Sequence, residues 1–259
     1  METTILFELV GNVGKITLNR PDKYNAFNRE MALQLQQVLD DCANDPAVRC
    51  VYITGAGKAF CSGQDLGEVT DPNGPGMNRI LNEHYNPIVS RIKRLEKPVV
   101  AAVNGVAAGA GANIALVCDI VVAAESASFI QAFSAIGLIP DSGGTFMLPR
   151  LVGWQKASAL MMLGDKVPAA EAERIGMIYK WFPDADFATA SSAIAEKLGM
   201  MPTKGLGFTK TALRWSFSHT FNEQLENEDK LQQRAAQTDD FKEGVAAFLE
   251  KRKPNFRGE

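Results

Sequence analysis

Apolar and β-branched residues dominate two short runs near the start of the chain, residues 5–10 and 13–19, which Gly11 and Asn12 separate. A two-residue connection of this composition between two β-prone runs is typical of a tight hairpin. The chain is therefore predicted to begin with β structure.

Helical spacing follows these strands. Asn28 is a residue type that often caps a helix, and apolar residues then recur three or four positions apart, at Met31, Leu35, Val38, Leu39 and Cys42. Buried strands are predicted at 49–54, at 99–103 and at 119–123, with a helix of small residues from about Gly111. Strands that alternate with helices predict an α/β layered architecture with largely parallel pairing.

The pattern becomes helical beyond about Gly153. Helices are predicted at 154–163 and 169–175, with amphipathic stretches from Phe187 onward. Pro202 and a longer polar/apolar repeat in 221–249 indicate a boundary near residue 200, so we expect a core at 1–200 and a C-terminal helical region at 201–259. Apolar positions late in the chain are expected to cover the same chain or a neighbouring subunit, namely Phe241, Val245, Phe248 and Leu249.

Composition narrows the class of protein. Of the 259 residues, 46% are hydrophobic and 22% are charged, as in a globular protein with a sizeable core. The net charge of −3 gives no overall basic field, so we expect no nucleic-acid partner. No apolar stretch approaches the roughly 20 residues that span a bilayer, so no membrane segment is expected.

The N-terminus and the cysteines indicate a compartment. The first residues lack the cationic start and the small-residue cleavage site of a signal peptide. The four cysteines are scattered, with no CxxC pair and no Cys/His cluster, at Cys42, Cys50, Cys61 and Cys118. Free thiols, no metal site and a cytoplasmic location are therefore predicted.

The first candidate for chemistry is the run AFCSGQDL at 59–66, just after the strand predicted at 49–54. Small residues at the end of a strand leave backbone N–H groups unobstructed, as an oxyanion hole requires. A tight turn followed by Asp65 as a helix cap explains the same residues. Both interpretations stay open.

The second candidate is VNGVAAGAGAN at 103–113, again directly after a buried strand. A strand, a Gly/Ala turn and a helix start place free N–H groups and the positive end of a helix dipole at one point. Close helix packing through small residues is the alternative. The glycine spacing matches neither GxGxxG nor a P-loop, so nucleotide binding of either kind is not supported.

The third candidate is IPDSGGT at 139–145. A carboxylate held by Pro and Gly could shuttle a proton, but Asp141 or Ser142 could equally cap the next helix. Elsewhere, His84 and His219 lie in helical settings without a nucleophile motif and are expected at the surface or in packing. Residues 71–77 are predicted to form a surface loop, and Lys210 to lie on a solvated helix face.

Taken in order, five segments resemble the crotonase (enoyl-CoA hydratase/isomerase) superfamily over essentially the whole chain: ITLNRPDKYNAFN, AFCSGQDL, KPVVAAVNGVAAGAGANIALVCDIVVAAESASF, GLIPDSGG and LPRLVG. The resemblance implies a spiral of ββα units with a C-terminal helical region used for trimer formation, and usually a hexamer. It also implies an acyl-CoA thioester as substrate, with coenzyme A as part of that substrate and no permanently bound cofactor.

The resemblance assigns residues to the site. The paired oxyanion donors map onto the backbone N–H groups of Gln64 and Ala110, where side-chain identity is expected to matter less than backbone position. Residues that fall where the family holds the cofactor part of the substrate are Lys23, Ala26, Gln64, Asp65 and Leu66, with Phe248 and Lys251 at the C-terminal end.

Departures from the family pattern bear on the reaction. Hydratases of the family carry two glutamates that activate water, and these positions read Asn113 and Phe133 here. Neither side chain is an efficient base, so hydration is disfavoured, whereas Asp141 stands where isomerase-type members place a catalytic acid. Asn113 and Phe133 are counted among the substrate-contacting residues, and Phe133 with Phe129 is expected to shape an apolar pocket.

The runs YNPIV, AAGAGAN, SFIQAF and IPDSGGT look closest to the ring-epoxide isomerases of the family, which convert 1,2-epoxyphenylacetyl-CoA to oxepin-CoA. The sequence therefore predicts an acyl-CoA isomerase that uses Asp141, Gln64 and Ala110. The resemblance also implies that the enzyme can shift the double bond of an enoyl-CoA. The alternatives are an enoyl-CoA hydratase or acyl-CoA hydrolase, and a non-catalytic protein that binds CoA or a partner enzyme.

Overall fold

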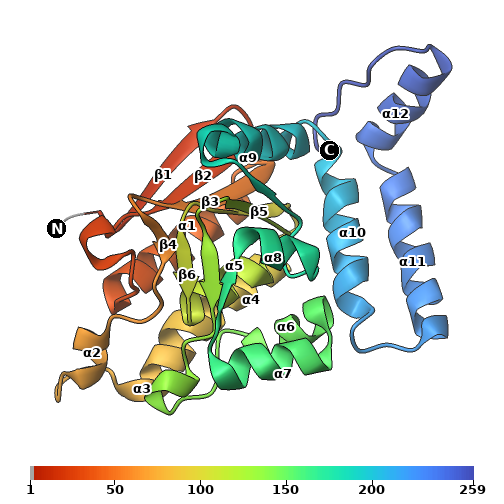
Figure 1. Ribbon diagram of the computed structural model, residues 1–259. Coiled ribbons are helices and arrows are strands. Elements are labelled where there is room, and N and C mark those ends of the chain that lie inside the picture. The colour runs from red at the N-terminus through yellow and green to blue at the C-terminus, as the bar shows by residue number, and fades with distance from the viewer. Residues whose placement is uncertain (1–2) are drawn as a thin grey trace.

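The computed structural model describes residues 3–259, and its body is built on two β-sheets (Figure 1). The larger sheet has the strand order β1-β2-β3-β5-β7-β10. Its strands are β1 (Ile5–Val10), β2 (Val13–Leu18), β3 (Cys50–Gly55), β5 (Val99–Val103), β7 (Ile120–Ala124) and β10 (Lys180–Phe182). Among the described residues of this sheet, only β1 and β2 pair antiparallel, so the predicted hairpin and the predicted largely parallel pairing are both confirmed.

A second sheet, which the sequence pattern did not predict, has the order β4-β6-β8-β9. Its strands are only three residues long: β4 (Ala59–Cys61), β6 (Val106–Ala108), β8 (Ser128–Ile130) and β9 (Lys166–Pro168). The chain passes from the large sheet to the small one three times, from β3 to β4, β5 to β6 and β7 to β8. These repeated crossings form the spiral that the family resemblance implied.

Helices fill the spaces around the sheets. The long helix α1 (Arg29–Asn44) begins at Asn28, whose side chain accepts a hydrogen bond from the Met31 N–H, as predicted for a cap. Its residues Met31, Leu35, Leu39 and Cys42 are buried in the core. Helix α5 (Ala110–Val117) is buried along its whole length, because small side chains let it lie between both sheets and its neighbouring helices.

The remaining helices of the body connect these layers. They are α2 (Leu66–Thr70), α3 (Gly76–Arg79), a π-helix (Ile80–Tyr85), α4 (Asn86–Arg94), α6 (Gly144–Val152), α7 (Trp154–Leu163), α8 (Ala169–Arg174) and α9 (Asp184–Gly199), with 3₁₀ turns at Pro21–Lys23 and Ser134–Ile136. The helices predicted at 154–163 and 169–175 are confirmed. The predicted surface loop at 71–77 is partly helical, because α3 begins at Gly76.

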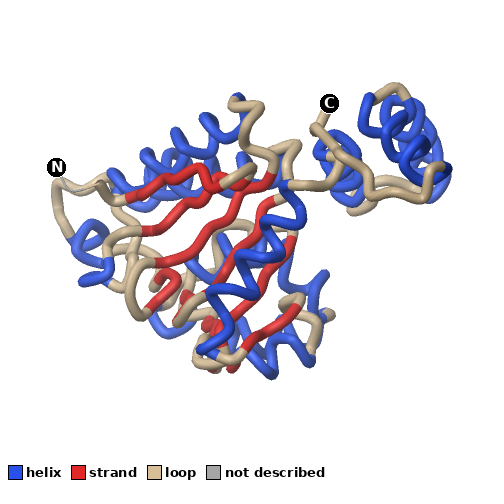
Figure 2. Tube along the Cα trace, turned by 90° about the horizontal axis from the view of Figure 1, so that it is seen from above, coloured by secondary structure: helices blue, strands red, loops and turns tan. Residues whose placement is uncertain are grey.

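The last three helices stand to one side of the body (Figures 1 and 2). They are α10 (Thr203–Trp215), α11 (Phe221–Ala236) and α12 (Asp239–Leu249). Arg49 of the body connects to this region, because its guanidinium donates to Thr203 Oγ1 and to the Phe256 carbonyl, each at 2.9 Å. Phe241, Val245, Phe248 and Leu249 remain exposed, so they do not cover the body of their own chain.

Lys210 corrects one expectation about the C-terminal region. Its ammonium pairs with Asp119 at 2.7 Å and donates to the carbonyls of Ile92 and Lys97, and its side chain is only 10% exposed. The prediction of a solvated lysine was wrong, because periodicity within one helix does not reveal a carboxylate supplied by a distant strand end. No helix within residues 3–259 is long and apolar enough to cross a membrane.

Candidate active site

The three Gly-rich candidate segments meet at one pocket of about 510 Å³. Strands β4, β6 and β8 are neighbours and run parallel, so the segments that follow their carboxyl ends emerge at the same edge of the small sheet. Gln64 follows β4, Ala110 follows β6 and Phe133 follows β8, and all three line the pocket. Other predicted site residues that line this pocket are Lys23, Ala26, Asp65, Leu66 and Asp141.

Two glycines bring the oxyanion candidates together. Gly63 has φ 96° and Gly109 has φ 52°, a region that other residues rarely adopt. A Cβ on Gly63 would lie 3.0 Å from the Ala108 oxygen and 3.6 Å from the Ala110 nitrogen, so the two segments are in close contact. Within residues 3–259, the backbone N–H groups of Gln64 and Ala110 have no hydrogen-bond acceptor. Two free donors thus lie beside each other at the pocket.

Close packing, the alternative for the second segment, also occurs. A Cβ on Gly111 would lie 2.4 Å from the Cys61 oxygen, so this glycine lets α5 approach β4. The helix start is therefore fixed against the strand that precedes Gln64. The packing places the two N–H groups at a defined separation.

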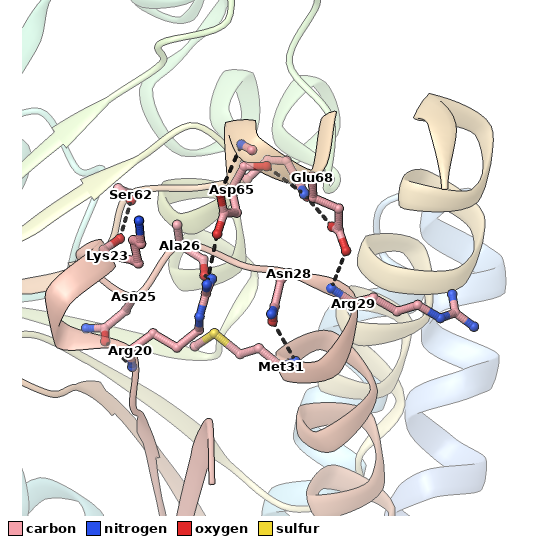
Figure 3. Close-up of polar contacts among 12 residues, drawn as sticks. Arg20, Lys23, Asn25, Ala26, Asn28, Arg29, Met31, Ser62, Asp65 and Glu68 are labelled. Atoms are coloured by element: carbon pink, nitrogen blue, oxygen red, sulfur yellow. Dashed lines mark hydrogen bonds and ion pairs between the residues drawn. The ribbon is translucent and has the colours of Figure 1, made fainter. Parts of the chain in front are cut away.

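Asp65 has the capping role that was the alternative for the first segment. Its carboxylate accepts from the Gly67 N–H at 3.0 Å and from Arg20 Nη2 at 2.8 Å (Figure 3). Partial burial alone would raise its pKa, but the hydrogen bonds from Arg20 and Gly67 outweigh burial and lower the pKa below its ordinary value. Asp65 is thus an ionised carboxylate that fixes the start of α2.

Asp141 lines the same pocket as a half-buried carboxyl group. Ser142 Oγ donates to Asp141 Oδ1 at 2.8 Å, but burial is the larger influence and raises the pKa of Asp141. The capping alternative was wrong, because α6 begins after Gly143 without a side-chain cap, and the Asp141 backbone carbonyl accepts the Gly144 N–H instead. The carboxyl group therefore remains available to the pocket.

Asn113 lies behind the wall and not on it. The residue is 1% exposed. Its side-chain nitrogen donates to the Asp141 carbonyl at 2.9 Å, and its side-chain oxygen accepts from Gln131 Nε2 at 2.8 Å. The structure thus places Asn113 against Asp141 and away from direct contact with a pocket ligand. Phe133 lines the pocket as predicted, whereas Phe129 is buried in β8 and does not.

Phe248 and Lys251 are not brought to this pocket. Phe248 is 82% exposed near the end of α12, where it borders a separate groove with Phe241 and Phe256. Lys251 follows the same helix and is exposed. Within one chain, the C-terminal part of the predicted site is therefore separate from the rest.

Two hydrogen bonds of the Gln64 side chain could not be predicted from the sequence. The Tyr85 hydroxyl donates to Gln64 Oε1 at 2.8 Å, and Gln64 Nε2 donates to Glu68 Oε2 at 2.8 Å. Tyr85 ends the π-helix Ile80–Tyr85, a geometry that no simple periodicity predicts. The YNPIV run was the only signal in this part of the chain.

The two histidines, His84 and His219, do not line the pocket. His84 is fully buried and His219 stacks on Trp215 with ring centroids 4.4 Å apart, as expected for packing and surface residues. Over the described range 3–259, no group of three or more His, Cys, Asp or Glu side chains could hold a metal ion.

The sequence profile of the enoyl-CoA hydratase/isomerase family matches residues 8–259. The chain belongs to the enoyl-CoA hydratase/isomerase family. It is 45% identical to the 1,2-epoxyphenylacetyl-CoA isomerase of Escherichia coli, with 98% of each chain covered. It is 44% identical, with the same coverage, to a Rhodobacter capsulatus protein named "Probable enoyl-CoA hydratase".

Solved structures of the family share this fold. An enoyl-CoA hydratase from Bacillus anthracis superposes with a TM-score of 0.93 at 32% identity, over 99% of this chain and 100% of that one. The crotonase-type spiral with C-terminal helices is therefore confirmed. The protein is an enzyme of this family, and an acyl-CoA thioester substrate fits that membership.

Proposed function

We propose that this enzyme is an acyl-CoA isomerase whose preferred substrate is 1,2-epoxyphenylacetyl-CoA. The observation that carries the proposal is the half-buried carboxyl group of Asp141, which lines the same pocket as the free N–H groups of Gln64 and Ala110 and, unlike Asp65, is not paired with an arginine. One carboxyl group suits the movement of one proton within a substrate. Identity of 45% to an epoxyphenylacetyl-CoA isomerase supports the choice of substrate.

In the proposed mechanism, the thioester oxygen accepts hydrogen bonds from the Gln64 and Ala110 N–H groups. The Asp141 carboxylate removes a proton from the carbon next to the thioester carbonyl, and the resulting enolate oxygen is stabilised by both donors. The bond shared by the epoxide and the six-membered ring opens to the seven-membered ring, and Asp141 returns the proton to a ring carbon. No atom is gained or lost, and each donor lowers the activation barrier by about 3 to 4 kcal/mol.

Direct water activation is disfavoured in this pocket. The family resemblance places hydratase glutamates at Asn113 and Phe133, and the Asn113 amide is already engaged by Asp141 and Gln131. Phe133 presents only an apolar ring to the ligand space. Hydration would therefore depend on Asp141 alone.

The test compares wild type with Asp141→Asn on epoxyphenylacetyl-CoA and on a 3-enoyl-CoA. We expect turnover of both by wild type, loss of at least a hundredfold in the variant, and unchanged affinity for the CoA thioester. Unchanged rates in Asp141→Asn would remove this residue from the mechanism.

A hydratase is the second candidate function, because 44% identity to a protein named as an enoyl-CoA hydratase favours it. Crotonyl-CoA discriminates between the two candidates. Substantial hydration of crotonyl-CoA together with inactivity toward the epoxide would favour the hydratase over the isomerase. Binding without turnover of any acyl-CoA would indicate a non-catalytic protein. Assembly into trimers or hexamers, with the 201–259 region at the interface, stays a prediction.

A further inference from the structure

The side chain of Gln64 is hydrogen-bonded at both its oxygen and its nitrogen. Its Oε1 accepts from the Tyr85 hydroxyl and its Nε2 donates to Glu68 Oε2, each at 2.8 Å. Glu68 in turn accepts the Arg29 N–H at 2.9 Å through its other oxygen (Figure 3). The Gln64 side chain is therefore fixed at both ends of its amide, which a residue that contributes only backbone would not require.

Tyr85 also contacts the strand segment that holds the Gln64 backbone. Phe27 donates its N–H to the Gly63 carbonyl and accepts the Asp65 N–H, so it brackets Gln64 on both sides. The Tyr85 ring packs edge-on against the Phe27 ring, with centroids 5.9 Å apart and planes at 66°. Tyr85 thus touches Gln64 through a hydrogen bond and the bracket around Gln64 through its ring.

Burial makes this hydrogen bond a strong constraint. Tyr85 is 1% exposed, and burial raises the pKa of its hydroxyl well above its ordinary value, so the group stays a neutral donor. A buried donor that loses its acceptor has no water to replace it, so the pair is held together. The free Gln64 N–H is consequently held in one orientation before any ligand arrives.

We infer that Tyr85 is a positioning residue that orients the oxyanion donor of Gln64 by acting through the Gln64 side chain. The inference rests on the proposed oxyanion role of the Gln64 backbone and deepens it. It contradicts the expectation that the identity of the side chain at position 64 matters little. A preorganised donor stabilises the enolate more than the ground-state thioester, so the effect belongs in kcat and not in binding.

The experiment is a double-mutant cycle of Tyr85→Phe and Gln64→Met. Tyr85→Phe keeps the ring that packs on Phe27, and Gln64→Met keeps the backbone N–H and the side-chain length. Each single variant is expected to lower kcat on a 3-enoyl-CoA about tenfold, with KM within twofold of wild type. The double variant is expected to match Gln64→Met and not to lose a further tenfold, because Gln64→Met already removes the Tyr85 hydrogen bond together with the Glu68 bond.

A second readout does not need turnover. Acetoacetyl-CoA is a β-keto thioester whose enolate absorbs in the near ultraviolet, so the enolate fraction of the bound compound reports oxyanion stabilisation directly. We expect each variant to lower the enolate-to-ketone ratio about tenfold with unchanged total affinity. Tyr179→Phe, which alters an exposed tyrosine away from the pocket, is the matched control and should behave as wild type.

The outcomes separate this inference from the proposed function. Enolate formation by wild type and equally by Tyr85→Phe overturns the inference alone. A hundredfold, multiplicative loss in the double variant also overturns it, because Tyr85 would then act independently of the Gln64 side chain. A wild-type protein that neither turns over an acyl-CoA nor binds the enolate overturns both. Thermal unfolding of each variant near the wild-type temperature shows that the fold is intact.

Discussion

Asn113 donates a hydrogen bond from its side-chain amide to the backbone carbonyl of Asp141 at 2.9 Å. The same amide fits against Gly144, where a Cβ would lie 2.3 Å from Asn113 Nδ2. A residue of α5 thus holds the segment that carries the pocket carboxyl group. The contact connects the second Gly-rich segment to the third.

Replacing Asn113 with Ala should loosen this segment. The change leaves Gln131 Nε2 without its acceptor and removes one donor from Asp141, so we expect a loss of about 1 to 3 kcal/mol in the free energy of unfolding and a lower kcat. Urea denaturation and steady-state kinetics measure the two effects. Asn44→Ala removes a similar bond, to the Asp40 carbonyl, at an exposed position and should cost less than about 0.5 kcal/mol. Equal losses in the two variants would contradict the prediction.

The raised pKa of Asp141 predicts how activity depends on pH. A carboxylate base is lost as pH falls through its pKa, so the acidic limb of kcat/KM should have its midpoint above the ordinary value of 3.8. The limb is measured by initial rates between pH 4 and 8 on the substrate that wild type turns over. A midpoint at or below 3.8 would show that another group, or none, controls this limb.

The same pKa shift predicts a pH-dependent effect on stability. Because the pKa of Asp141 is raised in the folded state, ionisation of this group lowers the free energy of unfolding. The loss disappears below pH 3.8, where Asp141 is protonated in both the folded and the unfolded state. Asp141→Asn removes this cost, so its melting temperature should exceed that of wild type at pH 7, with a gain that shrinks as the pH falls toward 3.8. Differential scanning calorimetry at several pH values tests this, and a gain that grows toward low pH would refute the sign.

Gly109→Ala should damage the site more than the fold. The backbone at φ 52° and ψ −127° costs an alanine roughly 1 to 3 kcal/mol, and relief of that strain would move the adjacent Ala110 N–H. A fall in kcat of about a hundredfold is expected, as for loss of one oxyanion donor. Gly11→Ala is the matched control, because Gly11 has φ 58° in the β1–β2 turn with open space around it. It should lose stability but keep its kcat.

The partly buried pair between Lys210 and Asp119 should contribute to stability. Lys210→Met would leave Asp119, whose side chain is 22% exposed and still accepts the Val99 N–H, without its cation, so we expect the free energy of unfolding to fall by about 1.5 to 3 kcal/mol. Lys242→Met breaks an exposed pair with Asp239 and should cost no more than about 1 kcal/mol. Guanidinium denaturation of both variants makes the comparison, and similar values would mean that burial does not matter here.

The sequence by itself determined the strands and helices whose patterns are local. The hairpin, α1 with its Asn28 cap and the strand at 99–103 follow from side-chain periodicity and from turn residues, which act over a few positions. The short strands β4, β6 and β8 do not, because runs of only three residues, AFC, VAA and SFI, are too short to show a periodicity and become strands only beside their neighbours.

The candidate site, too, was predictable from the sequence only in part. Gln64, Ala110 and Asp141 were proposed from the sequence, because a Gly-rich turn or a carboxylate can be read locally, together with its position in an ordered set of motifs. Only the tertiary structure decided that Asn113 supports Asp141 from behind and that Tyr85 reaches Gln64. These contacts join residues 21 and 28 positions apart, and their geometry depends on how helices pack against the small sheet, which no local pattern encodes.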